Sequence, residues 1–350
     1  NVLLWQLKEK APLFILSAAV SFITLYAPQS SSAGYYPLSS RIANAIVSFV
    51  KYLEKTFWPY DLAVFYPFSI QIPAWHVMGA ALLIIVITTV VIFIMKRLPC
   101  LFVGWFWFAI AIAPVIGVIQ ISGYSMADRY HYLPSIGIAI TVAWGIPPLL
   151  RNEATKIKVL FPVAIAFIIA MTILTYKQCI YWKNSATLFR HALLVTKNNY
   201  LAHNSMGIAL FAEGRYEEAL DNYNKAINIR PDYIRPYHNR GALYVSIGQY
   251  KKAMADYDRA IFLSPDTAEI YNNRGILYSI LRRHRRAIMD YTEAIRLKPY
   301  YFEAFNNRGY AYFSIGQYQR AIMDYNKAIS IKPEIGLFYV NRASTYFKQG

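Results

Sequence analysis

The sequence predicts an all-α protein in two parts, a polytopic helical membrane domain over residues 1–180 and an α-solenoid of repeated helix pairs over residues 181–350. Two observations support this prediction. Long blocks of the first half contain no Asp, Glu, Lys or Arg, although the 350-residue chain has a net charge of +17. In the second half, the same residue types recur every 34 positions.

The uncharged blocks predict membrane-spanning helices. A spanning helix needs about 20 mainly apolar residues, because lipid offers the backbone no hydrogen-bond partner. We expect five spans, near 11–27, 74–95, 98–120, 132–150 and 157–177. Pro147 and Pro148 should end or kink the fourth span. The chain opens on Asn1 rather than Met, and it stops partway through a repeat, so we expect an excerpt of a longer protein.

Residues 41–57 predict a further helix that lies flat in the membrane interface. Its apolar residues form one stripe, at Ile42, Ile46, Phe49, Val50, Leu53 and Phe57. Its polar residues lie opposite, at Arg41, Asn44, Ser48, Lys51 and Lys55. A helix with one greasy stripe suits the interface better than the bilayer core. The alternative is that this helix also spans.

The basic connections predict the orientation. If 41–57 lies flat, the connections 8–10, 96–97 and 151–158 fall on one side, which the positive-inside rule makes cytoplasmic. Residues 28–73, the loop 121–132 and everything after residue 178 then lie outside the cytoplasm. If 41–57 spans, the basic connections are distributed over both faces.

The second half carries a recurring set of small, aromatic and proline residues. Its markers are Gly207, Gly241, Gly275 and Gly309; Ala219, Ala253, Ala287 and Ala321; Tyr223, Tyr257, Tyr291 and Tyr325; and Pro231, Pro265, Pro299 and Pro333. A 34-residue period with these residue types is the tetratricopeptide pattern. We expect units at 200–233, 234–267, 268–301 and 302–335, a degenerate half unit at 182–199 and a truncated unit at 336–350.

Stacked tetratricopeptide units form a concave groove that commonly holds peptides. One asparagine recurs where it would line this groove, at Asn239, Asn273, Asn307 and Asn341. Amide groups both donate and accept, so such a ladder would grip an extended peptide backbone. The alternative is a structural role in the repeat. The run "RRHRR" (282–286) is either a solvated turn or a contact for anionic headgroups or an acidic partner.

The external loop 121–132 holds the one candidate site of the membrane domain. Asp128, Arg129, Tyr130 and Tyr132 lie at the predicted membrane boundary, where ionisable groups usually mark a site. Arg129 would bind a lipid phosphate through its planar fork of donors. The alternative is an anchor that pairs with Asp128 or extends to the interface. The isolated residues His76, His131, His191 and His203 are interpreted as structural.

The stretches "FWPYDLAVFYP", "GWFWFAIAIAPVIGVIQISGYSMADRYHYLPSIG" and "WKNSATLFRHAL", followed by tetratricopeptide units, resemble the transmembrane and tetratricopeptide repeat-containing proteins. This family includes bacterial members and eukaryotic O-mannosyltransferases of the C superfamily of glycosyltransferases. The resemblance implies transfer of a sugar from a polyprenyl-phosphate carrier to an exported protein that the repeats present. It also implies that the catalytic acids lie in an earlier loop, so no catalytic residue is named.

Two functions follow from these expectations. The first is a membrane glycosyltransferase with a polyprenyl-phosphate-linked sugar as donor and no bound cofactor or metal. The second is a non-enzymatic membrane-anchored scaffold that gathers protein partners outside the cytoplasm. Nucleic acid is not expected as a partner. The expected location is a bacterial inner membrane with periplasmic repeats, or alternatively an endoplasmic reticulum membrane with lumenal repeats.

Overall fold

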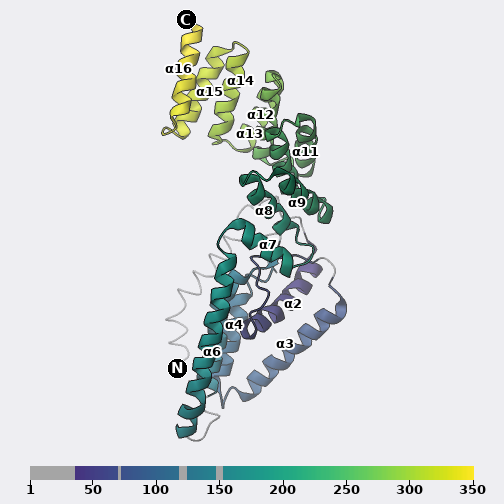
Figure 1. Cartoon of the computed structure of the whole chain (residues 1–350), viewed down its shortest axis with the longest axis vertical. Coiled ribbons are helices and arrows are strands. Elements are labelled where there is room, and N and C mark those ends of the chain that lie inside the picture. Colours follow the sequence, from purple (N-terminus) through teal and green to yellow (C-terminus); the bar gives the residue numbers. More distant parts are fainter. Residues whose placement is uncertain (1–35, 70–71, 118–123, 147–152) are drawn as a thin grey trace, which may run out of the picture. The chain divides into compact units, whose positions relative to one another are not determined.

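The computed structural model describes residues 36–69, 72–117, 124–146 and 153–350 (Figure 1). The chain divides into two compact units, one ending at Met206 and one beginning at Gly207. The first unit thus extends beyond the predicted boundary at residue 180. The reason is packing, because Ala192 and Ala202 share a small apolar cluster with Ala63.

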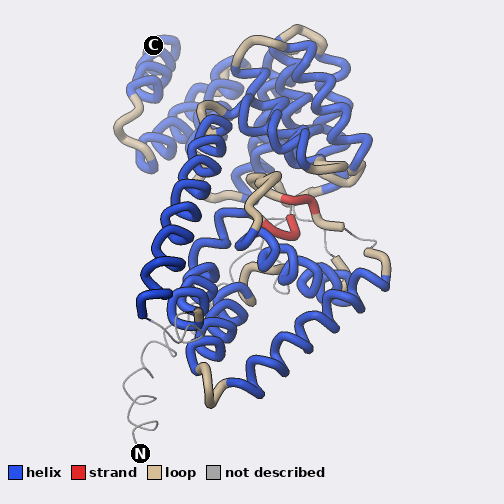
Figure 2. The backbone as a smooth tube through the Cα atoms, turned by 60° about the horizontal axis from the view of Figure 1, so that its bottom comes forward, coloured by secondary structure: helices blue, strands red, loops and turns tan. Residues whose placement is uncertain are grey.

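The first unit consists mainly of helices. These are α2 (Leu38–Phe57), α3 (Ala74–Ile94), α4 (Pro99–Ile112), α5 (Tyr132–Gly145), α6 (Glu153–Tyr181) and α7 (Ser185–Val195), with a 3-10 helix η1 at Asp128–His131. The strands β1 (Tyr66–Pro67) and β2 (Tyr124–Met126) pair antiparallel, and Figure 2 shows them in red. They hold the 60–67 segment against the residues that precede η1.

In the part of the chain that the structure describes, two helices are long and apolar enough to cross a membrane, Ala74–Ile94 and Lys158–Tyr181 within α6. Both were predicted. Almost none of their residues are buried within the protein, whereas a core helix of a soluble protein would be mostly covered. Their apolar side chains therefore fit a lipid environment. The predicted span at 11–27 lies outside the described residues.

The other two predicted spans are shorter than expected. Helix α4 has 14 residues and ends at Ile112, shortly before Pro114, which cannot continue the ladder of helical hydrogen bonds. A helix of this length extends about 21 Å, less than the roughly 30 Å hydrocarbon core. Helix α5 ends at Gly145, before Pro147 and Pro148, as the sequence predicted.

Helices α4 and α5 cross at two glycines. A Cβ added to Gly104 would collide with the carbonyl group of Gly137, and a Cβ added to Gly137 would collide with that of Gly104. Small residues at a crossing let two apolar helices approach closely, which is typical of helix packing in membranes.

Helix α2 is only partly the predicted flat helix. Its Ala45, Phe49 and Tyr52 are buried in the core of the first unit, where the Phe49 ring meets Trp105 and Phe108 edge-on. Ile42 and Phe57, from the same apolar stripe, stay about half exposed. From the stripe, Phe49 is buried in this core and Leu53 packs against it, so these residues help to hold α2 on the first unit.

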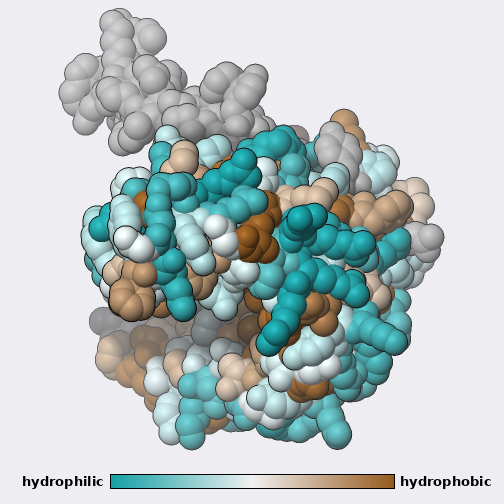
Figure 3. Space-filling model, turned by 90° about the horizontal axis from the view of Figure 1, so that it is seen from above, coloured by the Kyte–Doolittle hydropathy of each residue, from teal (hydrophilic) through white to brown (hydrophobic). Residues whose placement is uncertain are grey.

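The second unit is a stack of helix pairs, as predicted. Its helices are the end of α8 (Tyr200–Ala212), α9 (Tyr216–Ile229), α10 (Ile234–Ser246), α11 (Tyr250–Leu263), α12 (Ala268–Ile280), α13 (His284–Leu297), α14 (Phe302–Ser314), α15 (Tyr318–Ile331) and α16 (Gly336–Gln349). Each recurring glycine lies against the ring of the recurring tyrosine; a Cβ at Gly275 would come within 2.6 Å of Tyr291. Seen from above, the surface of the molecule is mostly hydrophilic, with smaller hydrophobic patches (Figure 3).

Candidate functional site

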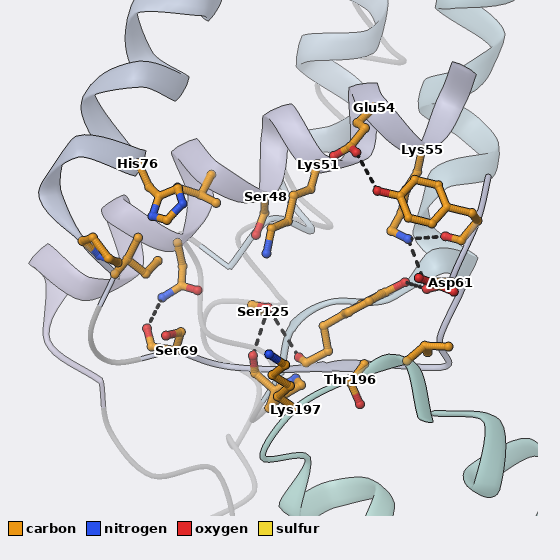
Figure 4. A pocket seen from close by; sticks show the side chains of 18 residues that line it. Ser48, Lys51, Glu54, Lys55, Asp61, Ser69, His76, Ser125, Thr196 and Lys197 are labelled. Carbon is orange, nitrogen blue, oxygen red and sulfur yellow. Dashed lines mark hydrogen bonds between the residues drawn. The ribbon is translucent and has the colours of Figure 1, made fainter. Parts of the chain in front are cut away.

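A polar cavity of about 520 Å³ lies in the first unit, between α2, the stretches 60–69 and 72–73, and residues 195–197 (Figure 4). Helix α2 provides Asn44, Ser48, Lys51 and Lys55, which follow at intervals of three or four residues and so share one side of the helix. The volume is within the roughly 300–1,000 Å³ typical of small-molecule sites. The packing of the apolar side of α2 is what directs these polar groups into the cavity.

Lysines outnumber acids in the cavity lining. Lys51, Lys55 and Lys197 line it together with the ring of His76, against Glu54 and Asp61. Figure 4 shows Lys51 directed into the space from α2 and Lys197 from the segment after α7. Within the described parts of the chain, no hydrogen bond or ion pair engages the ammonium group of either lysine. The cavity therefore offers the donors of two ammonium groups to an anion.

Lys55, by contrast, is occupied. Its Nζ donates hydrogen bonds to the carbonyl oxygens of Tyr60 at 2.9 Å and Asp61 at 3.2 Å, and it lies 5.2 Å from the centroid of the Tyr66 ring. Burial lowers the pKa of Lys55, an effect that the nearby carboxylate of Asp128 opposes. Lys55 thus fixes the 60–61 turn, where Asp61 adopts a left-handed backbone with φ of 48°.

Asp128 lies behind the cavity wall. Its Oδ2 accepts a hydrogen bond of 2.9 Å from the hydroxyl of Tyr66, which lines the cavity, and another from the backbone N–H of Ala63. Burial raises the pKa of Asp128, while the charge of Lys55 and these hydrogen bonds oppose the rise. The charged neighbour of Asp128 is therefore Lys55 and not Arg129.

The other predicted site residues lie outside this lining. Arg129 is exposed, with Nη1 3.4 Å from the carbonyl oxygen of Val64 and its guanidinium 4.9 Å from the centroid of the Tyr130 ring. Tyr132 begins α5 and is 80% exposed. The structure thus separates the predicted set, with Asp128 directed inward and Arg129 and Tyr132 outward.

His131 is part of a structural junction between α2 and η1. Its Nε2 is 2.9 Å from Oγ1 of Thr56, and its ring stacks on Tyr52 at 5.7 Å. The Tyr52 hydroxyl donates to the carbonyl oxygen of Ala127 and accepts from its N–H. Burial lowers the pKa of His131, and the positive charge of Lys55 adds to this effect.

The cavity was not predicted from the sequence. His76 was interpreted as an isolated structural residue, and helix 41–57 was expected to lie flat in the membrane interface. The lysine pattern of α2 was a usable signal, but Lys197 comes from the turn between α7 and α8. That turn is held by Asn199, whose Nδ2 lies 3.3 Å from the carbonyl oxygen of Phe65.

In the second unit, the recurring asparagines bond to the preceding repeat. The Nδ2 of Asn307 donates to Oδ1 of Asn272 at 3.0 Å, and Asn341 makes the same bond to Asn306 at 2.9 Å. Nδ2 of Asn273 lies 2.6 Å from Nε2 of His238. These amides therefore contribute to the cohesion of the stack.

The arginine after three of the four asparagines makes an ion pair with a buried aspartate, and these pairs were not singled out from the sequence. In each of three units the Arg guanidinium donates through two nitrogens to both oxygens of an Asp on the second helix, in the pairs Arg240–Asp256, Arg274–Asp290 and Arg308–Asp324. Nη1 of Arg274 also reaches Asp258 of the preceding unit at 2.7 Å. The signal was present, because both residue types share the 34-residue period.

The run 282–286 covers the end of the turn before α13 and the first three residues of that helix. Arg282 has a φ of 55° at the position where Gly214, Gly248 and Gly316 have φ values between 74° and 76°. The five residues and Ile315 border a shallow recess of about 340 Å³. Separately, the described part of the chain contains no group of three or more His, Cys, Asp or Glu residues that could hold a metal.

Comparisons with known proteins identify the repeats. A family model described as "TPR repeat" matches residues 207–248 and 242–279, and models described as "Tetratricopeptide repeat" match 268–301 and 302–335. Among solved structures, the chain is similar to YrrB, a TPR protein with an unusual peptide-binding site, at 20% identity and a TM-score of 0.41 over 47% of this chain and 84% of that one. It is similar to MamA at 23% identity and a TM-score of 0.39, over 43% and 87% of the two chains.

Two curated relatives are protein O-mannosyl-transferases. The chain is 33% identical to human TMTC3 over 122 residues, which are 35% of this chain and 13% of the relative. It is 28% identical to Tmtc3 of Drosophila melanogaster over 139 residues, 39% of this chain and 15% of the relative. The chain thus matches less than a sixth of the length of each. Residues 207–335 are tetratricopeptide repeats, and over its repeat region the chain is similar to the TMTC protein O-mannosyl-transferases.

Proposed function

We propose that this chain is a portion of a membrane glycosyltransferase that transfers a sugar from a polyprenyl-phosphate carrier to an exported protein. The observation that carries this proposal is the similarity to relatives named protein O-mannosyl-transferases. Two features of the first unit support it: the apolar helices α3 and α6, and a cationic cavity beside the start of α3. A scaffold that only gathers partners would need neither the cavity nor more than one anchor.

The acceptor is proposed to bind in the groove of the repeats. Tetratricopeptide arrays commonly hold peptides on their concave surface. Asn239, Asn273, Asn307 and Asn341 are the proposed peptide contacts. An amide oxygen has two lone pairs, so an asparagine whose NH₂ group bonds to the neighbouring repeat still offers an acceptor to a peptide N–H.

The segment 128–132 is proposed to contact the donor. The exposed guanidinium of Arg129 suits a phosphate oxygen, and Tyr130 and Tyr132 are proposed to line its approach. Asp128 is a positioning residue in this scheme, because it bonds to Tyr66 of the cavity wall. The catalytic acids are not assigned to any residue of this chain.

The proposed reaction takes place outside the cytoplasm, on the periplasmic side of a bacterial inner membrane or in the lumen of the endoplasmic reticulum. The carrier phosphate is the leaving group, so no cofactor is required for the transfer. A cationic pocket stabilises the negative charge that develops on a departing phosphate.

Transfer of labelled sugar tests the proposal. The intact protein, purified in detergent, would be supplied with polyprenyl-phosphate mannose and an exported protein as acceptor. We expect label on the acceptor, and we expect Arg129→Ala to abolish it while Arg190→Ala, an exposed arginine of α7, does not. Acceptor binding without transfer from any polyprenyl-phosphate sugar would establish the scaffold instead. Full transfer by Arg129→Ala would make Arg129 an interface anchor.

A further inference from the structure

A second recess adjoins the polar cavity. It has a volume of about 320 Å³ and lies between α2 and α3, where Val47, Val50, Trp75, Ala80 and Leu83 line it together with Gly79. We call this recess the apolar groove. Lys51 and His76 line both the apolar groove and the polar cavity, so the two spaces meet at these side chains. A cationic cavity thus continues directly into an apolar groove.

The cationic cavity is suited to an anionic group. The ammonium groups of Lys51 and Lys197 have no hydrogen-bond or ion-pair partner in the described parts of the chain, and the His76 ring lies at the same wall. Lys55 and Glu54 are already used, Lys55 by two carbonyl oxygens and Glu54 by the Tyr60 hydroxyl at 3.0 Å. A phosphate has enough oxygens to accept from Lys51, Lys197 and His76 at once.

The groove is suited to a hydrocarbon chain. It runs beside the first turns of α3, which is long and apolar enough to cross a membrane. Farther along α3, Leu82, Ile85 and Val86 are exposed. A hydrocarbon that follows α3 would therefore leave the groove onto an apolar helix surface. Burial of methylene groups in the groove removes apolar surface from water and so stabilises the bound state.

We propose that the cavity and the groove together bind one single-chain lipid phosphate. The phosphate lies between Lys51 and Lys197 with His76 beside it, and the first part of the hydrocarbon lies in the groove next to Gly79. This proposal deepens the proposed function, because it places the bound carrier phosphate in the cavity and leaves Arg129 to contact the donor on its approach, outside the lining. It rests on the proposed function only for the sugar. A free phosphate would leave the groove empty, and a neutral lipid would leave both lysines unpaired.

Binding of sugar-free polyprenyl phosphate tests the anion site. The full chain in detergent would be titrated by calorimetry, and each of Lys51→Ala and Lys197→Ala should weaken binding by roughly tenfold, the size of one charged hydrogen bond. Lys183→Ala, an exposed lysine outside the lining, should bind like the parent chain. Unchanged affinity in the double variant Lys51→Ala, Lys197→Ala would overturn the proposal.

A groove variant distinguishes a lipid phosphate from a free one. Gly79 has open space around the position of a Cβ, so Gly79→Leu should fill the groove without a clash. It should weaken binding of polyprenyl phosphate at least tenfold but leave that of inorganic phosphate unchanged. Thr89→Leu, an exposed position of α3 that lines neither recess, is the matched control.

Two further outcomes decide the ligand. If inorganic phosphate binds as tightly as polyprenyl phosphate, the site belongs to a free phosphate and the proposal is wrong. If a two-chain anionic phospholipid displaces polyprenyl phosphate at equal concentration, the site is a general headgroup site and the single-chain assignment is wrong. These titrations contain no sugar or acceptor, so their result does not depend on the result of the transfer assay. Absence of binding with normal transfer would contradict only the lipid site, and binding without transfer would contradict only the proposed function.

Discussion

The hydroxyl of Tyr66 donates a 2.9 Å hydrogen bond to Oδ2 of Asp128, and this bond connects the segment before α5 with the wall of the polar cavity. Asp128, the neighbour of Arg129 in the sequence, therefore stabilises the cavity wall through Tyr66. The carboxylate of Asp128 and the guanidinium of Arg129 thus have separate roles. The backbone N–H of Ala63 bonds to the same oxygen, so the 61–66 segment is fixed at two points.

Asp128→Asn should reduce the loss of stability at higher pH. Burial raises the pKa of Asp128 in the folded protein. The folded protein therefore holds this proton more tightly than the unfolded chain does, and below the ordinary aspartate pKa this difference contributes fully to stability. The contribution is lost as the pH rises through the raised pKa of the folded protein. Asparagine retains an acceptor for Tyr66 and never ionises. Melting temperatures between about pH 4 and pH 8 should fall less in this variant. Asp232→Asn, at an exposed acid, serves as control, and identical pH profiles would contradict the prediction.

Arg274→Ala should loosen the repeat stack. The side chain of Asp290 is 9% exposed, and removal of its guanidinium partner leaves a buried carboxylate without compensation. Such a loss costs about 3–5 kcal/mol. Hydrogen exchange of α12 and α13 amides, followed by mass spectrometry, should accelerate accordingly.

Arg296→Ala is the matched control for that variant. Its partner Glu293 lies one turn away on the same helix, and the arginine side chain is 66% exposed. Exposed ion pairs are screened by water and contribute little to stability, so hydrogen exchange should change little. Equal effects of the two variants would mean that the recurring Arg–Asp pairs do not hold the repeats together.

Gly275→Ala should destabilise the third complete unit. The new Cβ would come within 2.6 Å of Cε1 of Tyr291, a buried ring with little room to move. Overpacking of this kind costs about 1–3 kcal/mol. Gly336→Ala, with no atom within 4 Å of its Cβ, should have no such cost. Chemical unfolding monitored by circular dichroism measures both, and a neutral Gly275→Ala would show that the ring yields.

Arg282→Gly should stabilise the turn before α13. A left-handed backbone costs a non-glycine residue about 1–2 kcal/mol, and the corresponding turns of three other units use glycine. Removal of this cost should raise the midpoint of denaturation. Arg283→Gly, at a φ of −92°, removes the same charge without relieving the backbone. A gain in both variants would point to charge repulsion rather than to backbone strain.

The sequence alone determined the elements that depend on local repetition. The 34-residue period fixed the helix pairs, because each unit repeats the same small residue, ring and proline, and α8 to α16 follow it. The length of the blocks without charged residues likewise identified α3 and the apolar part of α6. These signals are contained within a few turns of chain, so no distant contact is needed to interpret them.

Tertiary structure decided the candidate site. The lysine pattern of α2 was visible, but only the burial of Ala45, Phe49 and Tyr52 in the core turned it into a cavity wall. Lys197 and Tyr66 join that wall from distant segments, and Asp128 bonds to Tyr66 in place of its neighbour Arg129. A site built from separate segments depends on how they pack against each other, and packing is a property of the folded chain rather than of any one stretch.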